Sequence, residues 1–407
     1  MGVEATHDEV IQVVLERVSN VLGRPLVEGQ NNQTISLAVQ NLRRPRLYMN
    51  GVLLNQTHQF QDMGMVNGGE YTLLCDCRPC FPLLTQCRCA QVGVTKDNPP
   101  GRIVQLTTVA GTNPPYKYQF VKTLANAIYG KVKSCVKLHL RDDGTYTANQ
   151  PYEMFACKIM FKNRMTFYNP NATIFSEDPM MELATQQFLG SCNGGHHSNV
   201  CGLVECCEDQ GNIFAIMPFS DGGELYDYTL QATATTHAGR ACSCIPEDHA
   251  RGIFRQIVEG TSHMHSCFIV HSDLSPENVM IERGNPVVAK IIDFGMSKHV
   301  LPKTDGTNGS HMLPPLRGGK VFYLAPEIWQ ERPYRYDGYL ADIWSIGVML
   351  FIMITGSPPV DRADDQCARF NMICKGKILD MLNQWRNEVP TLTASAQDLI
   401  TRILIPE

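Results

Sequence analysis

Three short segments in the second half of the chain constrain its fold more than any other feature. They are HSDLSPENVMI (His271 to Ile281), Asp293-Phe294-Gly295 and Ala325-Pro326-Glu327. Their acid and amide side chains are able to act as a base, as metal ligands and as a structural carboxylate. A single aspartate would be weak evidence for a functional site, since most aspartates are solvated turn residues. Because these groups occur together and in order, we expect them to converge in one cleft.

The composition is that of a packed globular protein. The chain has 407 residues, of which 43% are hydrophobic and 18% charged, enough for two or three domains. A net charge of −5 gives no reason to expect nucleic acid or an anionic membrane as the main partner. The longest apolar stretch, Ile346 to Ile354, is too short to span a bilayer and fits a buried helix. Met1 to Val10 is acidic where a secretory signal would be basic, so we expect no export.

The first part of the chain has the pattern of a small α+β module, residues 1–90. Residues 7–22 carry apolar side chains at helical spacing. Arg46 to Leu74 then reads as short strands broken by the turn signals Asn50-Gly51 and Gly68-Gly69. This stretch resembles the second half of the ubiquitin (β-grasp) fold. A small α+β module of another kind remains the alternative.

The module ends in a cysteine-rich run, CDCRPCFPLLTQCRC, from Cys75 to Cys89. Cys77 and Cys80 have a spacing that can chelate zinc, and Cys87 or Cys89 would complete a tetrahedral site. The second pair is too close together for the usual zinc knuckle. We therefore favour a segment of reduced thiols over a zinc site.

Residues 91–116 are predicted to be a linker. They contain Asn98-Pro99-Pro100-Gly101 and Gly111-Thr112-Asn113-Pro114-Pro115, and both runs break regular structure. We therefore expect a second domain to begin at residue 117.

Further motifs follow from residue 117 in a fixed order. FACKIM places Lys158 on an apolar strand with Ala156 two residues before it, and SEDPMMELATQQFL supplies carboxylates on a helix. With the three segments above, these motifs make residues 117–407 similar to the eukaryotic protein kinase family, of the serine/threonine type because of Pro276-Glu277-Asn278. The resemblance implies an α+β fold with a β-rich N-lobe and a helical C-lobe. It also implies transfer of the γ-phosphate of ATP to protein hydroxyls, with Mg2+ as cofactor.

The resemblance assigns residues to the nucleotide site. FVKTLANAIYGKVKSC is similar to the glycine-rich loop, but Ala125 and Ala127 stand where glycines are usual, so we expect weaker ATP binding. Lys158 should contact the phosphates and pair with a carboxylate on the next helix. Glu177 and Glu182 are both available there, and we choose Glu182 because it lies inside the helix. The expected nucleotide-binding residues are Gly130, Val132, Ala156, Lys158, Glu182, Met217, Ser220, Glu224 and Met280.

The same resemblance assigns the chemistry. Asp273 would be the base or would orient the substrate hydroxyl, and Asn278 and Asp293 would bind Mg2+. Ser272 stands where many kinases have an arginine that pairs with a phosphate on the activation loop. We therefore predict activity independent of phosphorylation there, despite the hydroxyls of Ser297, Thr304, Thr307 and Ser310.

Two catalytic positions are exchanged relative to the family pattern. Ser275 stands where the loop lysine is usual, and Lys320 stands where a threonine is usual. The chain thus keeps one ammonium and one hydroxyl with their origins swapped. We expect both residues to act in catalysis, because positioned charge is the main contribution of the protein to this reaction. The alternative is a solvated Lys320 and an impaired enzyme.

The C-terminal part carries two further expectations. YLADIWSIGVMLFIMITGSPPV resembles the buried helix whose aspartate, here Asp342, accepts hydrogen bonds from the catalytic loop. Glu327 usually pairs with an arginine that would come after TRILIPE, so the resemblance implies an incomplete C-lobe. Gln186, one turn after Glu182, replaces an apolar residue that usually packs behind the site.

The function implied is a cytoplasmic serine/threonine protein kinase that acts on a protein substrate. The main alternative is a pseudokinase or scaffold that binds nucleotide or partners with little catalysis. A third interpretation makes the N-terminal module an interaction adaptor for a protein partner. ATP use implies a reducing compartment, so most of the 16 cysteines are expected to be free thiols. We expect no nucleic-acid partner and no stable membrane insertion.

Overall fold

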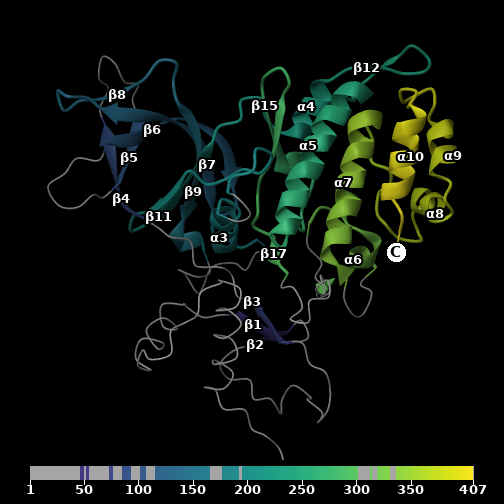
Figure 1. Cartoon of the computed structure of the whole chain (residues 1–407), viewed down its shortest axis with the longest axis horizontal. Helices are drawn as coiled ribbons and strands as arrows, with labels where there is room; N and C mark the ends of the chain where they lie inside the picture. Colours follow the sequence, from purple (N-terminus) through teal and green to yellow (C-terminus); the bar gives the residue numbers. More distant parts are fainter. Residues whose placement is uncertain are drawn as a thin grey trace, which may run out of the picture. The chain divides into compact units, whose positions relative to one another are not determined.

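The computed structural model divides the chain into two compact units, residues 1–81 and 82–407 (Figure 1). The residues that it describes are 46–49, 52–54, 73–76, 85–92, 101–106, 115–165, 177–191, 195–300, 312–313, 319–330 and 336–406. The helix predicted at residues 7–22 lies outside these ranges. So do Cys77 and Cys80 of the candidate zinc site.

The first unit contains a small antiparallel sheet. Its strand order is β2-β1-β3, with bounds Val52–Leu54, Arg46–Met49 and Leu73–Asp76. Tyr48 pairs with Leu53 on one side and with Leu74 on the other. Strands therefore occur where the turn signals predicted them, and the ubiquitin-like fold stays a prediction.

The second unit begins with an eight-stranded sheet that closes on itself. Its order is β6-β5-β4-β10-β11-β9-β7-β8, and β6 also pairs with β7. All strands except β8 thus form a closed ring of pairings, which makes a barrel, and β8 is added at its side through β7. The pairing of β4 with β10 is parallel, and the other pairs in the ring are antiparallel. The strands are β4 (Thr85–Val92), β5 (Gly101–Leu106), β6 (Tyr116–Ala127), β7 (Gly130–Leu140), β8 (Tyr146–Ala148), β9 (Met154–Phe161), β10 (Glu205–Glu208) and β11 (Asn212–Pro218).

The structure corrects the expected linker. Residues 85–92 and 101–106, assigned above to the end of the module and to the linker, are strands of the barrel. Ile103 pairs with Gln119, and Thr85 pairs with Cys207, so both strands are part of the second unit. Proline and glycine turns flank a short strand in the same way as they flank a linker, and the sequence pattern could not separate the two.

Alternating side chains of the barrel strands build two apolar cores. Ile159 and Phe214 belong to one, with Tyr118 and Phe120. Their neighbours Met160 and Ile213 belong to the other, which contains Leu183 of helix α3 (Pro179–Leu189). Strands β9 and β11 are therefore buried on both faces, and for this reason they are nearly continuous apolar runs.

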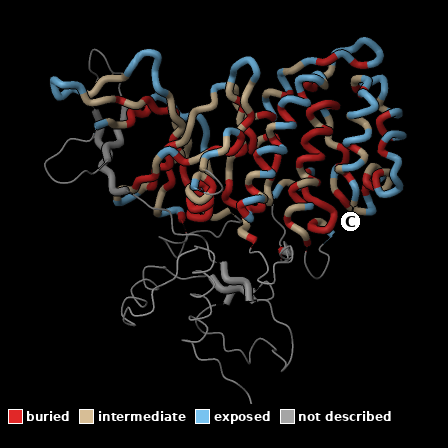
Figure 2. Tube along the Cα trace, in the orientation of Figure 1, coloured by how far each residue is buried: buried red, intermediate tan, exposed pale blue. Residues whose placement is uncertain are grey.

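The C-lobe is helical, which confirms the two-lobed α+β fold. Helices α5 and α10 pack against α7, whose buried residues continue into one large core shared with α5 (Figure 2). The bounds are α4 (Leu225–Gln231), α5 (Glu247–Ser266), α6 (Pro326–Trp329), α7 (Gly338–Thr355), α8 (Ala368–Cys374), α9 (Ile378–Gln384) and α10 (Ala394–Ile403).

Helix α7 contains the apolar run noted in the sequence. By length and composition it would suffice to cross a membrane, but 72% of its apolar window is buried inside the lobe. Asp337 caps its first turn by accepting from the backbone N–H groups of Tyr339 and Leu340, at 2.8 and 3.2 Å. Gly356 ends it in the left-handed conformation, with φ of 75°. The run is therefore explained by its place in the core.

Eight cysteines in the described part of the chain are thiols outside any disulfide, and among these eight Cys374 is the exposed one. Cys242 and Cys244 are joined by a disulfide in the segment before α5. Burial raises the pKa of the Cys135 and Cys201 thiols to about 12, so these two are inert packing residues.

Candidate active site

The N-lobe supplies a buried ion pair. Nζ of Lys158, on β9, lies 2.7 Å from Oε1 and 2.5 Å from Oε2 of Glu182, on α3. Burial raises the pKa of the Glu182 carboxyl to about 7, although the charge of Lys158 opposes this effect. Burial acts to lower the pKa of Lys158, but Glu182 and Asp293 outweigh it and raise that pKa, so the ammonium is retained.

The start of α3 explains why Glu182 and not Glu177 pairs with Lys158. Asp178 is the N-cap, and its Oδ1 accepts from the backbone N–H groups of Met180 and Met181 at 2.9 and 3.1 Å. Glu177 therefore precedes the helix, while Glu182 lies one turn inside it. Burial and the nearby charge of Asp293 raise the pKa of Glu177, which is a second carboxyl group close to the predicted metal-binding residue Asp293.

The loop after β14 (Ile269–Val270) is held in place by Asp342 of α7. The backbone N–H groups of His271 and Ser272 donate to Oδ2 and Oδ1 of Asp342, at 2.9 and 3.0 Å. Ser272 has a left-handed backbone, with φ of 66°, a conformation that persists only where surrounding bonds hold it. The prediction that Asp342 accepts hydrogen bonds from this loop is confirmed.

Asp273 and Asn278 are joined directly. Nδ2 of Asn278 donates to the carbonyl of Asp273 at 2.7 Å and to its Oδ2 at 2.8 Å. The backbone N–H of Ile292 donates to the Asn278 carbonyl at 2.9 Å, which brings Asp293 beside the loop. Because the amide nitrogen makes the bonds to Asp273, the Asn278 amide oxygen is available as a ligand. This oxygen and the Asp293 carboxylate are the hard donors that Mg2+ prefers, so the residues fit that ion.

Lys320 reaches the same loop from another segment. Its Nζ donates to Ser275 Oγ at 2.6 Å and lies 3.8 Å from Oδ2 of Asp273. Burial raises the pKa of Asp273, and the charge of Lys320 opposes that rise. Gly319 allows this approach, because it has φ of 97° and an added Cβ would lie 3.1 Å from Oδ1 of Asp273. The structure thus brings together Ser275 and Lys320, which the sequence separates by 45 positions.

Comparison with known proteins decides the family. The family model described as "Protein kinase domain" matches residues 144–407. The chain belongs to the protein kinase family.

Relatives among known kinases cover the same region. "CBL-interacting protein kinase 1" of Oryza sativa subsp. japonica is 31% identical over 291 residues, which are 71% of this chain and 52% of that protein. "CBL-interacting protein kinase 17" of the same organism is 31% identical over 71% of this chain and 53% of its own length. "SNF-related serine/threonine-protein kinase" of Rattus norvegicus is 32% identical over 51% of this chain and 24% of its own length. The chain therefore spans about half the length of the rice relatives.

The loop that should cover the nucleotide in this kinase domain is a paired hairpin. Ala125 pairs with Val132 and Ala127 with Gly130, so β6 and β7 stay paired down to the turn after two shifts of register between Phe120 and Ala125. Packing requires glycine at position 130, because an added Cβ would lie 1.8 Å from the carbonyl oxygen of Ile159. Tyr129 is buried, and its hydroxyl donates to the Glu177 carbonyl at 2.7 Å. Ala125 and Ala127 thus belong to a hairpin that is hydrogen-bonded, through Tyr129, to the segment just before α3.

The other expected nucleotide contacts gather where the two lobes of the kinase domain join. Ala156 of β9 pairs with Met217 of β11, and Val132 of β7 pairs with Lys158. Ser220 lies in the connection from β11 to α4. Glu224 forms an isolated bridge with Met280 of β15 (Val279–Glu282), which joins the connection to the C-lobe. The nine expected contacts thus lie on the neighbouring strands β7, β9 and β11, on α3, in the connection, and on β15 of the C-lobe.

The sequence analysis did not predict the contacts of three polar residues around the kinase site. Thr185 and Ser297 are 3% and 1% exposed, and their hydroxyl oxygens lie 3.0 Å apart. Gln186 is 1% exposed and donates from Nε2 to the Cys201 carbonyl at 3.3 Å. The available signal was the helical spacing of Glu182, Thr185 and Gln186, which places three polar side chains on one face of α3. Ser297 was considered only as an acceptor of phosphate, but its burial removes it from solvent.

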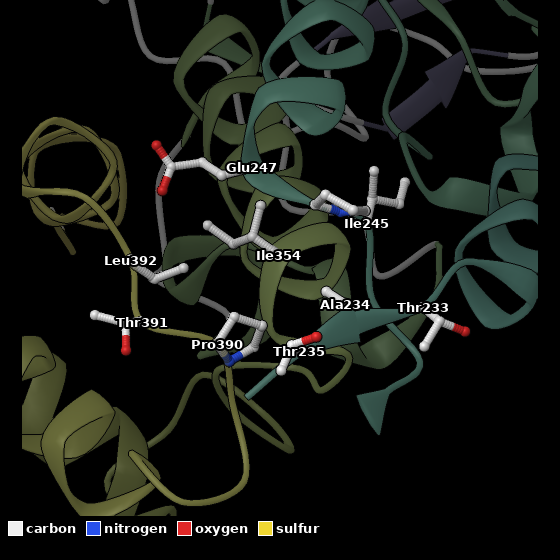
Figure 3. Close-up of a pocket in the computed structure, with 10 residues that line it drawn as sticks. Thr233, Ala234, Thr235, Ile245, Glu247, Ile354, Pro390, Thr391 and Leu392 are labelled. Carbon is white, nitrogen blue, oxygen red and sulfur yellow. The ribbon is translucent and has the colours of Figure 1, made fainter. Parts of the chain in front are cut away.

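A separate hollow of about 360 Å3 lies in the helical lobe, between the segment after α4 and the one before α10 (Figure 3). Ile245, Ile354 and Leu392 form its floor, and threonines lie at its rim. Glu247 points its carboxylate at Thr393, to which it is bonded at 2.5 and 2.9 Å. The hollow contains none of the predicted site residues.

Proposed function

We propose that this chain is an active serine/threonine protein kinase, which transfers the γ-phosphoryl group of ATP to a hydroxyl of a protein substrate. The observation that carries the proposal is the position of the Lys320 ammonium, 3.8 Å from Asp273 and in contact with Ser275. It supplies positive charge at the point where the usual loop lysine is absent. Family membership and the names of the relatives support the reaction type.

Each residue has a defined task in this proposal. Asp273 orients the substrate hydroxyl and accepts its proton as the oxygen attacks phosphorus. Lys158, fixed by Glu182, holds the phosphates on the nucleotide side, and Lys320 neutralises the charge of the transferred group. Asn278 and Asp293 would hold Mg2+, which neutralises phosphate charge when it is bound.

The test is transfer of labelled phosphate from ATP to a generic basic protein in the presence of Mg2+. Asp293→Ala is the control for dependence on the metal site. Incorporation that the control abolishes supports the kinase. Thermal stabilisation by ATP without incorporation contradicts it and favours a pseudokinase, and the absence of both effects favours the adaptor.

A further inference from the structure

The metal-binding turn, Asp293 to Ser297, is strained and must be held in place. Asp293 has φ of 64°, in the left-handed region that non-glycine residues rarely occupy. Within the turn, the Gly295 N–H donates to Oδ1 of Asp293 in a long hydrogen bond of 3.3 Å. A conformation of this kind persists where surrounding contacts determine it. The contacts that hold this turn therefore decide where the Asp293 carboxylate points.

Two of these contacts come from α3 and lie on either side of Glu182. Before the helix, the Asp178 N–H donates to the Gly295 carbonyl at 3.0 Å. One turn after Glu182, the hydroxyl of Thr185 lies 3.0 Å from that of Ser297. The helix that positions the Lys158 partner is thus joined to the metal-binding turn at two points, its N-cap and its middle.

The direction of the hydrogen bond between Thr185 and Ser297 follows from their neighbours. Ser297 Oγ lies 2.7 Å from the Phe294 carbonyl, which can only accept, so the single hydroxyl hydrogen of Ser297 is used there. Thr185 must then donate to Ser297. The result is a chain of two bonds from α3 through Ser297 to the middle of the metal-binding turn, closed off from solvent.

We propose that Thr185 and Ser297 are positioning residues of the kinase site. Their buried hydroxyl pair locks the Asp293 turn to α3, and it maintains the arrangement of Lys158 and Asp293 without a phosphate on the activation loop. The pair compensates for Ser272, which cannot bind such a phosphate as an arginine does. This inference rests on the proposed kinase function.

The test compares Thr185→Val, which removes the donor at nearly constant shape, with Thr185→Ser, which keeps it. Thr261→Val is the matched control, because Thr261 is a buried helical threonine whose hydroxyl, among the described residues, donates to the Ile257 carbonyl of the same helix. Loss of one buried hydrogen bond predicts a fall in kcat of about tenfold for Thr185→Val, equivalent to ~1.4 kcal/mol, and a higher Mg2+ requirement. Thr185→Ser and Thr261→Val should stay within about twofold.

A second measurement needs no catalysis. Hydrogen exchange in the protein without nucleotide should be faster at the Asp178 and Ser297 amides of Thr185→Val by about the same factor as kcat falls, about tenfold, and unchanged in Thr261→Val. If the wild-type chain transferred no phosphate, the proposed function would be wrong, while hydrogen exchange would still test whether Thr185 and Ser297 hold the Asp293 turn. Normal wild-type activity with unchanged exchange in Thr185→Val would overturn the lock alone.

Ser297→Ala provides an independent route if Thr185→Val does not fold. It removes the acceptor and should lower kcat at least as much as Thr185→Val. In the double variant the two effects should not multiply, because both variants break the same chain of bonds. Effects that multiply would show that the hydroxyls act separately and would contradict the proposal.

Discussion

The nucleotide side and the substrate side of this kinase site are built in different ways. On the nucleotide side, Lys158 and Glu182 are fixed by the register of β9 and by the cap of α3, at the positions the family pattern predicts. On the substrate side, Lys320 enters from the segment before α6 and meets Ser275 of the catalytic loop. The first side depends on backbone placement, and the second depends on the reach of one long side chain.

The difference shows that the position of the charge is a strict requirement of the site, while the segment that supplies the charge is not. A phosphoryl transfer site needs charge at defined points in space, and a lysine on a flexible stem can deliver that charge from more than one segment. A metal-binding aspartate has a short side chain, so its backbone must be in place. The segment that supplies the substrate-side lysine can therefore vary, whereas the position of the metal-binding aspartate cannot.

The largest effect is expected from a change on the nucleotide side. Asp293→Ala removes a carboxylate that no long side chain can replace, and it should lower kcat on the order of 10³-fold or more. Transfer of labelled phosphate measures this. Asp143→Ala, at an exposed loop carboxylate of the same unit, is the control and should retain full activity. Equal activity of Asp293→Ala and wild type would remove the metal-binding role.

A smaller loss is expected on the substrate side. Lys320→Met should lower kcat by about 100-fold, the scale for removal of one positioned group that stabilises developing charge. Lys375→Met, at an exposed lysine in the C-lobe, is the matched control.

The exchange itself can be tested by reversing it. The double variant Ser275→Lys with Lys320→Thr restores the usual family arrangement and should recover most of the activity lost in Lys320→Met. A double variant as inactive as Lys320→Met would show that position, and not only charge, matters on this side.

The pH dependence of Lys320→Met sharpens the same comparison. Asp273 must be ionised to accept a proton, so kcat/KM falls as the pH drops through its pKa. Burial raises this pKa and Lys320 opposes the rise, so removal of Lys320 should raise the pKa further. The acid limb of kcat/KM should therefore move to higher pH in Lys320→Met. An acid limb at the wild-type position would separate Lys320 from the electrostatics of Asp273.

The smallest effect is expected from phosphatase treatment. Ser272 offers no guanidinium to a phosphorylated activation loop, and Ser297 is buried, so activity should be unchanged within about twofold. A phosphatase-treated sample is compared with one incubated with inactivated phosphatase. Loss of activity on treatment would show that another cation replaces the missing arginine.

Much of the site could be predicted from short motifs. Asp273, Asn278 and Asp293 were found from their motifs alone, and in the structure they lie at the ends of β14, β15 and β16 (Val288–Ile291). The burial of α7 follows from its apolar run, because a helix that is apolar all round must lie in a core. The choice of Glu182 followed from its position inside α3.

Other features had no local signal. The strand at 85–92 pairs with β10, far along the chain, and the strand at 101–106 lies between turns in the way that a linker does. The bond between Thr185 and Ser297 joins residues 112 positions apart, and neither residue type is unusual where it occurs.

The sequence by itself determined the chemistry that is local in the chain: the family, the two-lobed fold, and the acids and amide of the catalytic segments. Only the tertiary structure decided which distant groups meet, namely Lys320 with Ser275, Thr185 with Ser297, and the strands that close the barrel. The reason is that periodicity and motif spacing reflect the local backbone. Contacts between distant segments depend instead on how packed elements are oriented in space.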